Sequence, residues 1–381
     1  MAIFRINGSI DTIDLTDHSS GAQHAIGSRA LNLTILVKTL AGGTGNGLVN
    51  VGFINAAGLG MGKIQLQGSL GKIDAGDSSG KSAIRSLVVD GDFGLSKGLP
   101  QMSHVKGGLN KLLVTGSMKG GLMQIEGILK SMAVTGDFEG APAGGGGAAG
   151  AMSASAPEGL AAQGFTFSAG ALLADAIGKI KIGGAMKGGA IVANKDLGSM
   201  SMNSFEAGGV FSGGKMHSVK VKGEMSTDNE AAPLIMSARD GIDSMVIKGD
   251  VKNAQFLAGY TKDGEAVNPD AHIGKIVVKG NWIQSSMVAG VEDSTHDGFG
   301  QNDTVISGDT TPSVLSRIAS LVIKGTAAGS AQGGDCFGIV AQEIGRLSIG
   351  GTGVALQQGT DDILLDAVNG DFRLLELPAH S

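Results

Sequence analysis

Residues 273–282, IGKIVVKGNW, decide the fold. In an extended chain successive side chains point to opposite faces, so Ile276 and Val278 share one face while Lys275 and Lys279 share the other. We therefore expect a short strand with an apolar inner face and a charged outer face. The glycine that follows marks a corner, where the backbone bends and comes close to neighbouring chain.

This pattern of an aliphatic triplet followed by glycine recurs along most of the chain. Clear neighbouring copies mostly lie 20 to 26 residues apart, and two weaker copies, at 200–203 and 305–308, divide intervals of about twice that length. The recurring glycines are Gly68, Gly91, Gly116, Gly136, Gly184, Gly223, Gly249, Gly280, Gly325 and Gly351, with Gly8 and Gly370 extending the series toward both ends.

A repeat of about 20–25 residues, built from strands and glycine turns, predicts an all-β fold, a parallel β-solenoid. The unit is too short for a propeller blade. One coil cannot bury its own apolar face, so successive coils must stack at about 4.8 Å and exchange hydrogen bonds. We expect irregular loop insertions at corners, over 227–233, 260–270 and 292–303, and a turn or two of helix at 169–176.

The domain organisation follows from where the repeat is clear. Residues 1–60 fit it least well, and we expect them to form a cap-like N-terminal solenoid segment. Solenoid coils are expected over 61–140 and 163–381. Between them, residues 141–162 form a Gly/Ala-rich segment that predicts a flexible loop.

The recurring motif carries a resemblance. The stretches Ile177-Gly-Lys-Ile-Lys-Ile182 and Ile273-Gly-Lys-Ile-Val-Val-Lys-Gly280 are similar to the repeats of very large bacterial surface-associated β-helix proteins. The similarity covers most of the chain from about residue 61 onward. The resemblance implies a right-handed parallel β-helix in an extracellular setting with a structural or adhesive role.

Composition excludes several classes of protein. Glycine supplies 66 of 381 residues without a Gly-X-Y period, which excludes collagen. The formal net charge of −6 argues against nucleic acid as a partner. No apolar stretch is long enough to span a membrane, and the single Cys336 excludes an intramolecular disulfide.

The compartment is less constrained by the sequence. The N-terminal stretch MAIFRINGSIDTIDL lacks a basic region followed by an apolar one, so no signal peptide is visible. We expect an extracellular or cell-surface location if the chain is a fragment of a longer exported protein. Otherwise we expect a cytoplasmic location.

Residues 75–82, AGDSSGKS, fit a loose phosphate-binding-loop pattern, and Asp90 ends a strand-like run as the acid of such an enzyme would. A phosphate-binding loop must lead into a helix, whose N-terminus holds the phosphates. The residues after Ser82 are instead a short β-branched run with no helical period. We therefore interpret 75–82 as a turn between two strands.

Parallel β-helices also include polysaccharide lyases and hydrolases, and glycoside hydrolysis needs two carboxylates at a defined separation. Asp361 and Asp362 are adjacent, and residues 296–298 and 302–304 are polar clusters. One Trp and one Tyr are too few to line a sugar cleft with stacking aromatic rings. We therefore predict no catalytic residue and no cofactor.

Two further residue types could carry chemistry. Cys336 would be a nucleophile only beside a histidine, and we expect it to be a small core or turn residue. The histidines show no metal-ligand spacing; His18 and His24, near Asp17, come closest, and we expect them in a solvated loop.

The stretch 292–303 gathers four carboxylates in twelve residues. Calcium prefers such oxygen-rich loops, which makes Asp293, Asp297 and Asp303 weak calcium candidates. The stretch matches neither an EF-hand nor a nonapeptide calcium repeat. The simpler interpretation is a solvated acidic turn.

Four lysines occupy the same outward position in their copies of the repeat. Two interpretations are open: a stripe that binds an acidic polymer, or a face that only keeps the protein soluble. We favour the soluble face, because the formal net charge of the chain is −6. Glu224 and Asp250 also lie across the corner and can partly neutralise the lysines. The four are Lys222, Lys248, Lys279 and Lys324.

Together these features predict a non-enzymatic structural β-solenoid that serves as a surface, spacer or filament component. Its strand-like ends, 3–6 and 363–377, predict end-to-end contact with other copies or with neighbouring segments of a longer chain. The alternative is a carbohydrate-active or polysaccharide-binding β-helix protein, whose partner would be a cell-surface polysaccharide. Carboxylates clustered in one concave groove would favour the alternative.

Overall fold

The computed structural model describes residues 10–16, 31–37, 47–77, 82–140, 170–230, 232–308, 313–330, 335–357, 360–366 and 368–378. The chain divides into two compact units: unit 1 comprises 1–152 and 167–191, and unit 2 comprises 153–166 and 192–381. Every regular element among the described residues is a β-strand, as predicted.

Several predictions from the sequence lie outside the described residues. They concern Lys81 of the loop-like motif, the pair His18 and His24, the glycine Gly8, and the flexible segment at 141–162. Of the expected N-terminal cap over 1–60, the structure describes 10–16, 31–37 and residues from 47 onward.

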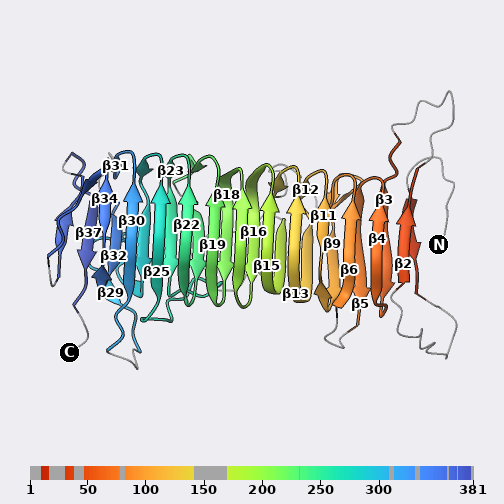
Figure 1. Ribbon diagram of the computed structural model, residues 1–381, viewed down its shortest axis with the longest axis horizontal. Helices are drawn as coiled ribbons and strands as arrows, with labels where there is room; N and C mark the ends of the chain where they lie inside the picture. The colour runs from red at the N-terminus through yellow and green to blue at the C-terminus, as the bar shows by residue number, and fades with distance from the viewer. Residues whose placement is uncertain are drawn as a thin grey trace. The chain divides into compact units, whose positions relative to one another are not determined.

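In unit 1 the strands form a large, mostly parallel sheet arranged in columns, in which each strand pairs with the corresponding strand of the next repeat (Figure 1). The first column contains β1 (Ile10–Asp14), β3 (Val51–Ala57), β5 (Leu70–Gly76), β9 (Met102–Lys106) and the first halves of β13 (Leu122–Val134) and β15 (Ala171–Ile182). The second contains β2 (Leu31–Ile35), β4 (Met61–Leu66), β6 (Ser82–Val89), β10 (Gly108–Leu109), β11 (Leu112–Val114) and the second halves of β13 and β15. Short strands β12 (Met118–Lys119), β14 (Phe138–Glu139) and the start of β16 (Ala185–Ala193) pair in a third, while β7 (Leu95–Ser96) and β8 (Leu99–Pro100) form a small antiparallel hairpin.

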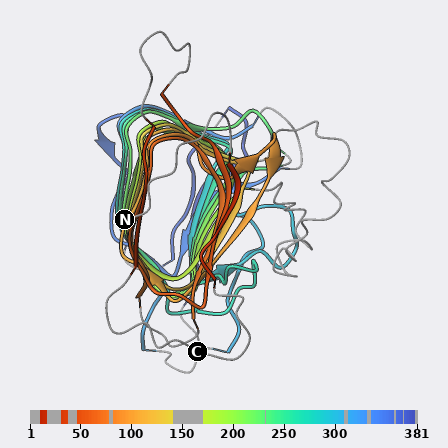
Figure 2. The same ribbon diagram turned by 90° about the vertical axis from the view of Figure 1, so that its right-hand side faces the viewer.

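Unit 2 contains three parallel columns. Column 1 contains β17 (Leu197–Met202), β19 (Lys215–Val221), β22 (Gly241–Ile247), β25 (His272–Val278), β30 (Arg317–Ile323), β33 (Glu343–Ile344) and β34 (Leu347–Ile349). Column 2 contains the two-residue strands β20 (Met225–Ser226), β23 (Val251–Lys252), β26 (Trp282–Ile283) and β31 (Ala327–Ala328). Column 3 contains β18 (Ser204–Ser212), β21 (Leu234–Ala238), β24 (Ala254–Ala258), β27 (Ser286–Ala289), β32 (Phe337–Ala341) and β37 (Phe372–Glu376). Figure 2 shows the unit 2 strands, green to blue, lying behind one another around an interior that side chains fill.

The side-chain alternation predicted for column 1 is confirmed. Val221, Ile247, Val278 and Ile323 align in register on four successive strands, and all four side chains are fully buried. The residues that precede them point to the outer face, where Val246, Val277 and Val322 are half-buried. Each buried side chain therefore packs on its equivalent in the next repeat, as the stacking argument requires.

The corner glycines stack directly on one another in unit 2. The Gly280 N–H donates to the Gly249 carbonyl at 3.1 Å, and the Gly325 N–H donates to the Gly280 carbonyl at 3.0 Å. The polar residue after each glycine closes the corner: Asp250 Oδ1 accepts the Asn281 N–H at 2.7 Å, and Asn281 Oδ1 accepts the Thr326 N–H at 3.0 Å. The side-chain oxygen thus accepts a hydrogen bond from a backbone N–H that the bend would otherwise leave without a partner.

The same device operates in unit 1. Asp92 Oδ1 accepts the Ser117 N–H at 2.8 Å, and Ser117 Oγ accepts the Asp137 N–H at 3.0 Å. The Lys119 ammonium reaches the second oxygen of Asp92 at 2.9 Å. This pair lowers the pKa of the Asp92 carboxyl against the opposing effect of burial. The recurring Gly-Ser, Gly-Asp and Gly-Asn pairs of the sequence are therefore corner caps.

The strands and their pairing test three predictions made for short segments. The weak copy at 200–203 is confirmed, because β17 pairs in register with β19. The weak copy at 305–308 is wrong: β25 pairs directly with β30, and β29 (Thr304–Val305) instead pairs antiparallel with β28 (Val291–Glu292) inside an insertion. Strand β6 begins at Ser82, so no helix follows the loop-like motif.

The predicted helix at 169–176 is also wrong. Strand β15 begins at Ala171 and pairs with β13, with Leu172 opposite Met123. Leu172 and Ala174 are buried while Leu173 between them is half-buried, so the period is two. Stacking on the preceding repeat outweighs the weak helical preference of the alanine-rich sequence.

The last repeat departs from the parallel pattern expected over 363–377. Strand β36 (Asp362–Leu364) pairs antiparallel with β37, and β35 (Thr352–Gly353) pairs antiparallel with β34. A short strand therefore lies along the outer edge of the last strand in columns 1 and 3. Short edge strands of this kind limit further pairing.

Replacing Gly280 with Ala tests the corner. An added Cβ would lie 2.2 Å from Asp250 Oδ1 and 2.6 Å from the Gly249 carbonyl carbon, so the stacked backbones must move apart. We expect Gly280→Ala to lower the unfolding free energy by about 1–3 kcal/mol. Gly353→Ala is the control, because nothing lies within 4 Å of its added Cβ, and it should cost less than about 0.5 kcal/mol. Equal losses in chemical denaturation would contradict the stacked corner.

Candidate functional site

Column 3 of unit 2 is covered on its outer face, unlike column 1. In β24 and β27 the outward Leu257 and Val288 are as buried as the inward side chains. Residues of two insertions lie around Leu257, because Tyr260, Gly264 and Glu292 line the same hollow as this side chain. The predicted insertions therefore exist, and they fold back onto this face.

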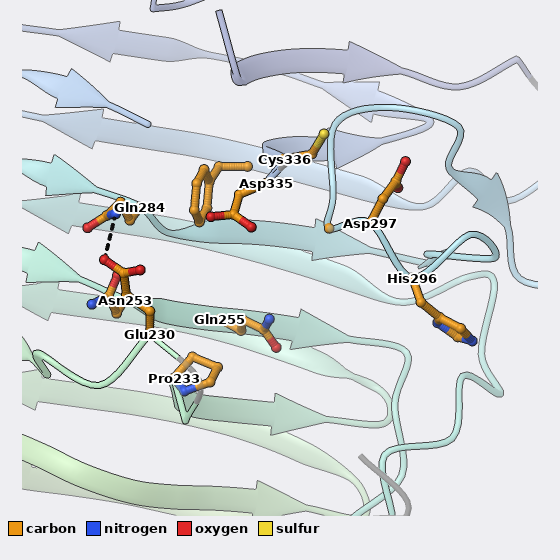
Figure 3. A pocket seen from close by; sticks show the side chains of 11 residues that line it. Glu230, Pro233, Asn253, Gln255, Gln284, His296, Asp297, Asp335 and Cys336 are labelled. Carbon is orange, nitrogen blue, oxygen red and sulfur yellow. Dashed lines mark hydrogen bonds between the residues drawn. The ribbon is translucent and has the colours of Figure 1, made fainter. Parts of the chain in front are cut away.

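Between these insertions lies a groove of about 450 Å³ (Figure 3). It is lined by Glu230, Pro233, Asn253, Gln255, Gln284, His296, Asp297, Gly298, Asp335, Cys336 and Phe337. A second hollow of about 900 Å³ shares three of these residues and adds the carboxylates of Asp263, Glu265, Glu292 and Asp293. The outer side of column 3 thus carries an acidic, amide-rich groove.

The amides of the groove are held by unusual backbone. Asn253 and Gln284 occupy equivalent positions in neighbouring repeats, with φ of 51° and 47°. Asn253 is buried and its Nδ2 donates to the Thr227 carbonyl at 2.8 Å, while Gln284 Nε2 donates to Glu230 Oε1 at 3.1 Å. The left-handed region is unfavourable for glutamine, and such strain is more frequent at functional sites.

Neither amide belongs to a motif that was predicted from the sequence. Both stand four residues after a corner glycine, Gly249 or Gly280, and this constant offset is the signal that could have found them. Groups of this kind, carboxylates beside amides, can bind hydroxyl or cationic groups of a ligand.

Carboxylates of the acidic loop at 292–303 accept hydrogen bonds from other residues of the same loop. Asp293 accepts the His296 N–H at 2.6 Å and the Gly298 N–H at 3.0 Å, and Asp297 accepts the Thr295 hydroxyl at 2.7 Å. These hydrogen bonds fold the loop into a compact turn. No motif in the sequence indicates that these acids cap the loop's own backbone.

Asp303 differs from the other two, because its side chain is only 8% exposed. One carboxyl oxygen accepts the Gly300 N–H at 2.6 Å, and the other has no hydrogen-bond partner among the described residues. Burial, with the nearby charges of Asp293 and Asp297, raises the pKa of Asp303 to about 7. Near neutral pH this carboxyl therefore exists in both protonation states.

No set of three or more His, Cys, Asp and Glu side chains within the described ranges converges so that it could hold a metal ion. The calcium candidates Asp293, Asp297 and Asp303 share one loop, and oxygens of all three accept hydrogen bonds within it, although the second oxygen of Asp303 does not. A calcium site here stays a prediction.

The surroundings of Cys336 disfavour a role as a nucleophile. Its side chain is half-buried, and burial together with four nearby aspartates, led by Asp297, raises the pKa of the thiol. A raised pKa disfavours the reactive thiolate. In Figure 3 the His296 ring points away from Cys336, so the two do not form a nucleophile and base pair.

The adjacent acids Asp361 and Asp362 lie away from the groove. Asp361 is buried and accepts the Gln357 N–H at 2.9 Å, while Asp362 pairs with the Arg373 guanidinium at 2.8 Å. The Asp362–Arg373 pair joins strands β36 and β37, and the Asp361 hydrogen bond holds the chain just before β36.

Comparisons with known proteins do not supply a function. No protein-family model matches the chain, and no match was found among curated proteins or among solved structures. The resemblance to bacterial surface β-helix repeats therefore stays a prediction. The described ranges contain no helix of the length and apolarity needed to cross a membrane.

The Asp303 carboxyl predicts a specific pH dependence. Its pKa is higher in the folded state than its ordinary value of 3.8, so its contribution to stability is full below about pH 4 and is lost as pH rises through about 7. We expect Asp303→Asn to raise the unfolding free energy at pH 8 by about 2–4 kcal/mol relative to wild type, and to change it little at pH 4.

Denaturant unfolding at a series of pH values measures this difference. Asp335→Asn is the control, since it also removes one carboxylate, and Asp335 is an exposed residue of the groove. A wild type and Asp303→Asn with parallel pH profiles would contradict the raised pKa. Adding calcium at pH 8 tests the calcium candidates, because an ion that Asp303 binds stabilises only the wild type.

Proposed function

We propose that the chain is a parallel β-solenoid with a non-enzymatic structural role. The observation that carries this proposal is the unshifted register of column 1. From β19 to β30, each strand pairs in parallel with the next over the same positions, although the intervening loops differ greatly in length. Successive turns of one solenoid would produce this arrangement.

The physical role follows from where the stabilising contacts lie. Buried aliphatic columns and corner caps connect each repeat to its neighbours, so stability is spread along the stack. Such a structure holds two points at a fixed separation, which suits a spacer, surface or filament component. The extracellular setting implied by the resemblance stays part of the proposal.

Chemical cross-linking tests the solenoid. Val246 and Val277 are register partners on the outer face, whereas Lys220 and Val277 lie two strands apart. In a Cys336→Ser background, a short bifunctional thiol reagent should bridge Val246→Cys with Val277→Cys, about 4.8 Å apart. It should not bridge Lys220→Cys with Val277→Cys. Equal bridging in both pairs, measured by mass spectrometry, would reject the stacking.

The proposal includes contact with other protein at a strand edge. Strands β1 and β2 each have one partner, β3 or β4, among the described residues. Leu31 N–H and the Ile35 carbonyl bond toward β4, so the N–H groups of Asn32 and Thr34 point to the other side. Because β35 and β36 cover the last strands of unit 2, we place the contact edge at β1 and β2.

Light scattering over a concentration series tests this edge. Thr34→Pro removes an outward N–H but none of the hydrogen bonds to β4, so it should lower the association measured for wild type. Thr34→Val keeps the N–H and is the control. A wild type that stays monomeric at high concentration, or equal association by both variants, would reject contact through this edge.

The groove favours a second candidate, a polysaccharide-binding or carbohydrate-active β-helix protein. Clustered carboxylates in one groove are the feature expected of that class. Against it, Glu230 and Asp293 are hydrogen-bonded within the protein, and among the described lining residues of the 450 Å³ groove Phe337 is the one aromatic ring besides His296. Release of reducing ends from a polysaccharide, abolished by Asp297→Asn, would favour this candidate over the structural role.

A further inference from the structure

The structure changes the interpretation of the four exposed lysines on column 1, here called the lysine column. Val221, Ile247, Val278 and Ile323 pair in register, and a lysine follows each of them. Backbone hydrogen bonds of 2.9–3.0 Å join each lysine N–H to the preceding strand. The lysine column therefore comprises Lys222, Lys248, Lys279 and Lys324, stacked at about 4.8 Å.

The lysine column forms no ion pair with an acid of the protein among the described residues. None of its four members lies within ion-pair distance of a carboxylate in the described part of the chain, although other lysines do, such as Lys119 with Asp92 and Lys252 with Asp228. Asp250, which the sequence offered as a neutralising partner, uses one oxygen to cap the next corner. Four like charges in a line repel one another unless an anionic partner binds.

The neighbouring side chains restrict the partner. Beside the lysine column, the outward positions on β22, β25 and β30 are Val246, Val277 and Val322, all half-buried. Lys220 and Lys275 add two exposed charges to the same face. The face therefore offers a line of cations along an aliphatic strip.

We propose that this face binds an acidic polysaccharide, a polyuronate chain lying across the strands of column 1. The sugar carboxylates meet the lysine column, and the C–H edges of the sugar rings pack on the valines. The strands β19, β22, β25 and β30 have no Phe, Tyr or Trp on which bases could stack, which disfavours a single-stranded nucleic acid. Each exposed pair is weak, and affinity arises because several pairs form on one chain.

The acidic groove is not involved in this proposal. It lies on column 3, repels the same polymer, and involves none of the four lysines. The register that builds the lysine column comes directly from strand pairing in unit 2. The proposal therefore does not depend on the structural role proposed above.

Binding of fluorescent polygalacturonate oligomers, followed by anisotropy at low and moderate salt, tests the proposal. The test variant is Lys222→Gln with Lys248→Gln, Lys279→Gln and Lys324→Gln. The control variant carries four exposed lysines of unit 1 changed to Gln: Lys63, Lys106, Lys111 and Lys130. Both variants have the same net charge, and thermal unfolding should match wild type, since the side chains are exposed.

We expect wild type to bind polygalacturonate, with affinity that falls as salt rises. The test variant should bind at least about tenfold more weakly, and the control variant should lose less than about twofold. Methyl-esterified polygalacturonate, which lacks the charges, should not bind. No binding by wild type, equal losses in both variants, or tighter binding of a single-stranded DNA oligonucleotide would overturn the proposal.

Discussion

The backbone contact at the stacked glycine corners is the constraint on which the rest of the structure depends. At Gly249, Gly280 and Gly325 the main chains of successive repeats approach closely enough to hydrogen-bond, and an added Cβ would meet backbone or the capping side chain. This contact fixes where each strand ends. Because strand register is fixed from the corner, a shift of one residue would turn the buried Ile and Val outward.

The corner also explains why a short polar residue follows several of these glycines. Asp, Asn and Ser are short side chains with an oxygen that can reach an amide of the next repeat. At Asp92 and Asp137 the same carboxylate also accepts a lysine ammonium from the next repeat. The side chains that turn the chain and those that join the repeats are therefore the same residues.

Insertions leave this constraint intact and create the functional surfaces. The chain between β27 and β30 holds a hairpin and an acidic loop, yet β25 and β30 pair without a shift. On column 3 the insertions cover the sheet and form the acidic groove. On column 1 no insertion among the described residues covers the outer face, and the lysine column stays exposed. One unit thus carries two faces of opposite charge, produced by the same repeat.

The sequence by itself determined the strand columns, because a period of two between glycines allows one set of side chains to be buried in a stack. It placed Ile247 and Val278 inside and the four lysines outside, and it marked 227–233, 260–270 and 292–303 as insertions. It failed at 169–176 and 305–308, where local composition could not show which segments pair over long separations. Only the tertiary structure decided that the insertions fold onto column 3. The buried Asp303 and the left-handed Asn253 and Gln284 depend on that fold-back, because their environment comes from residues distant in sequence.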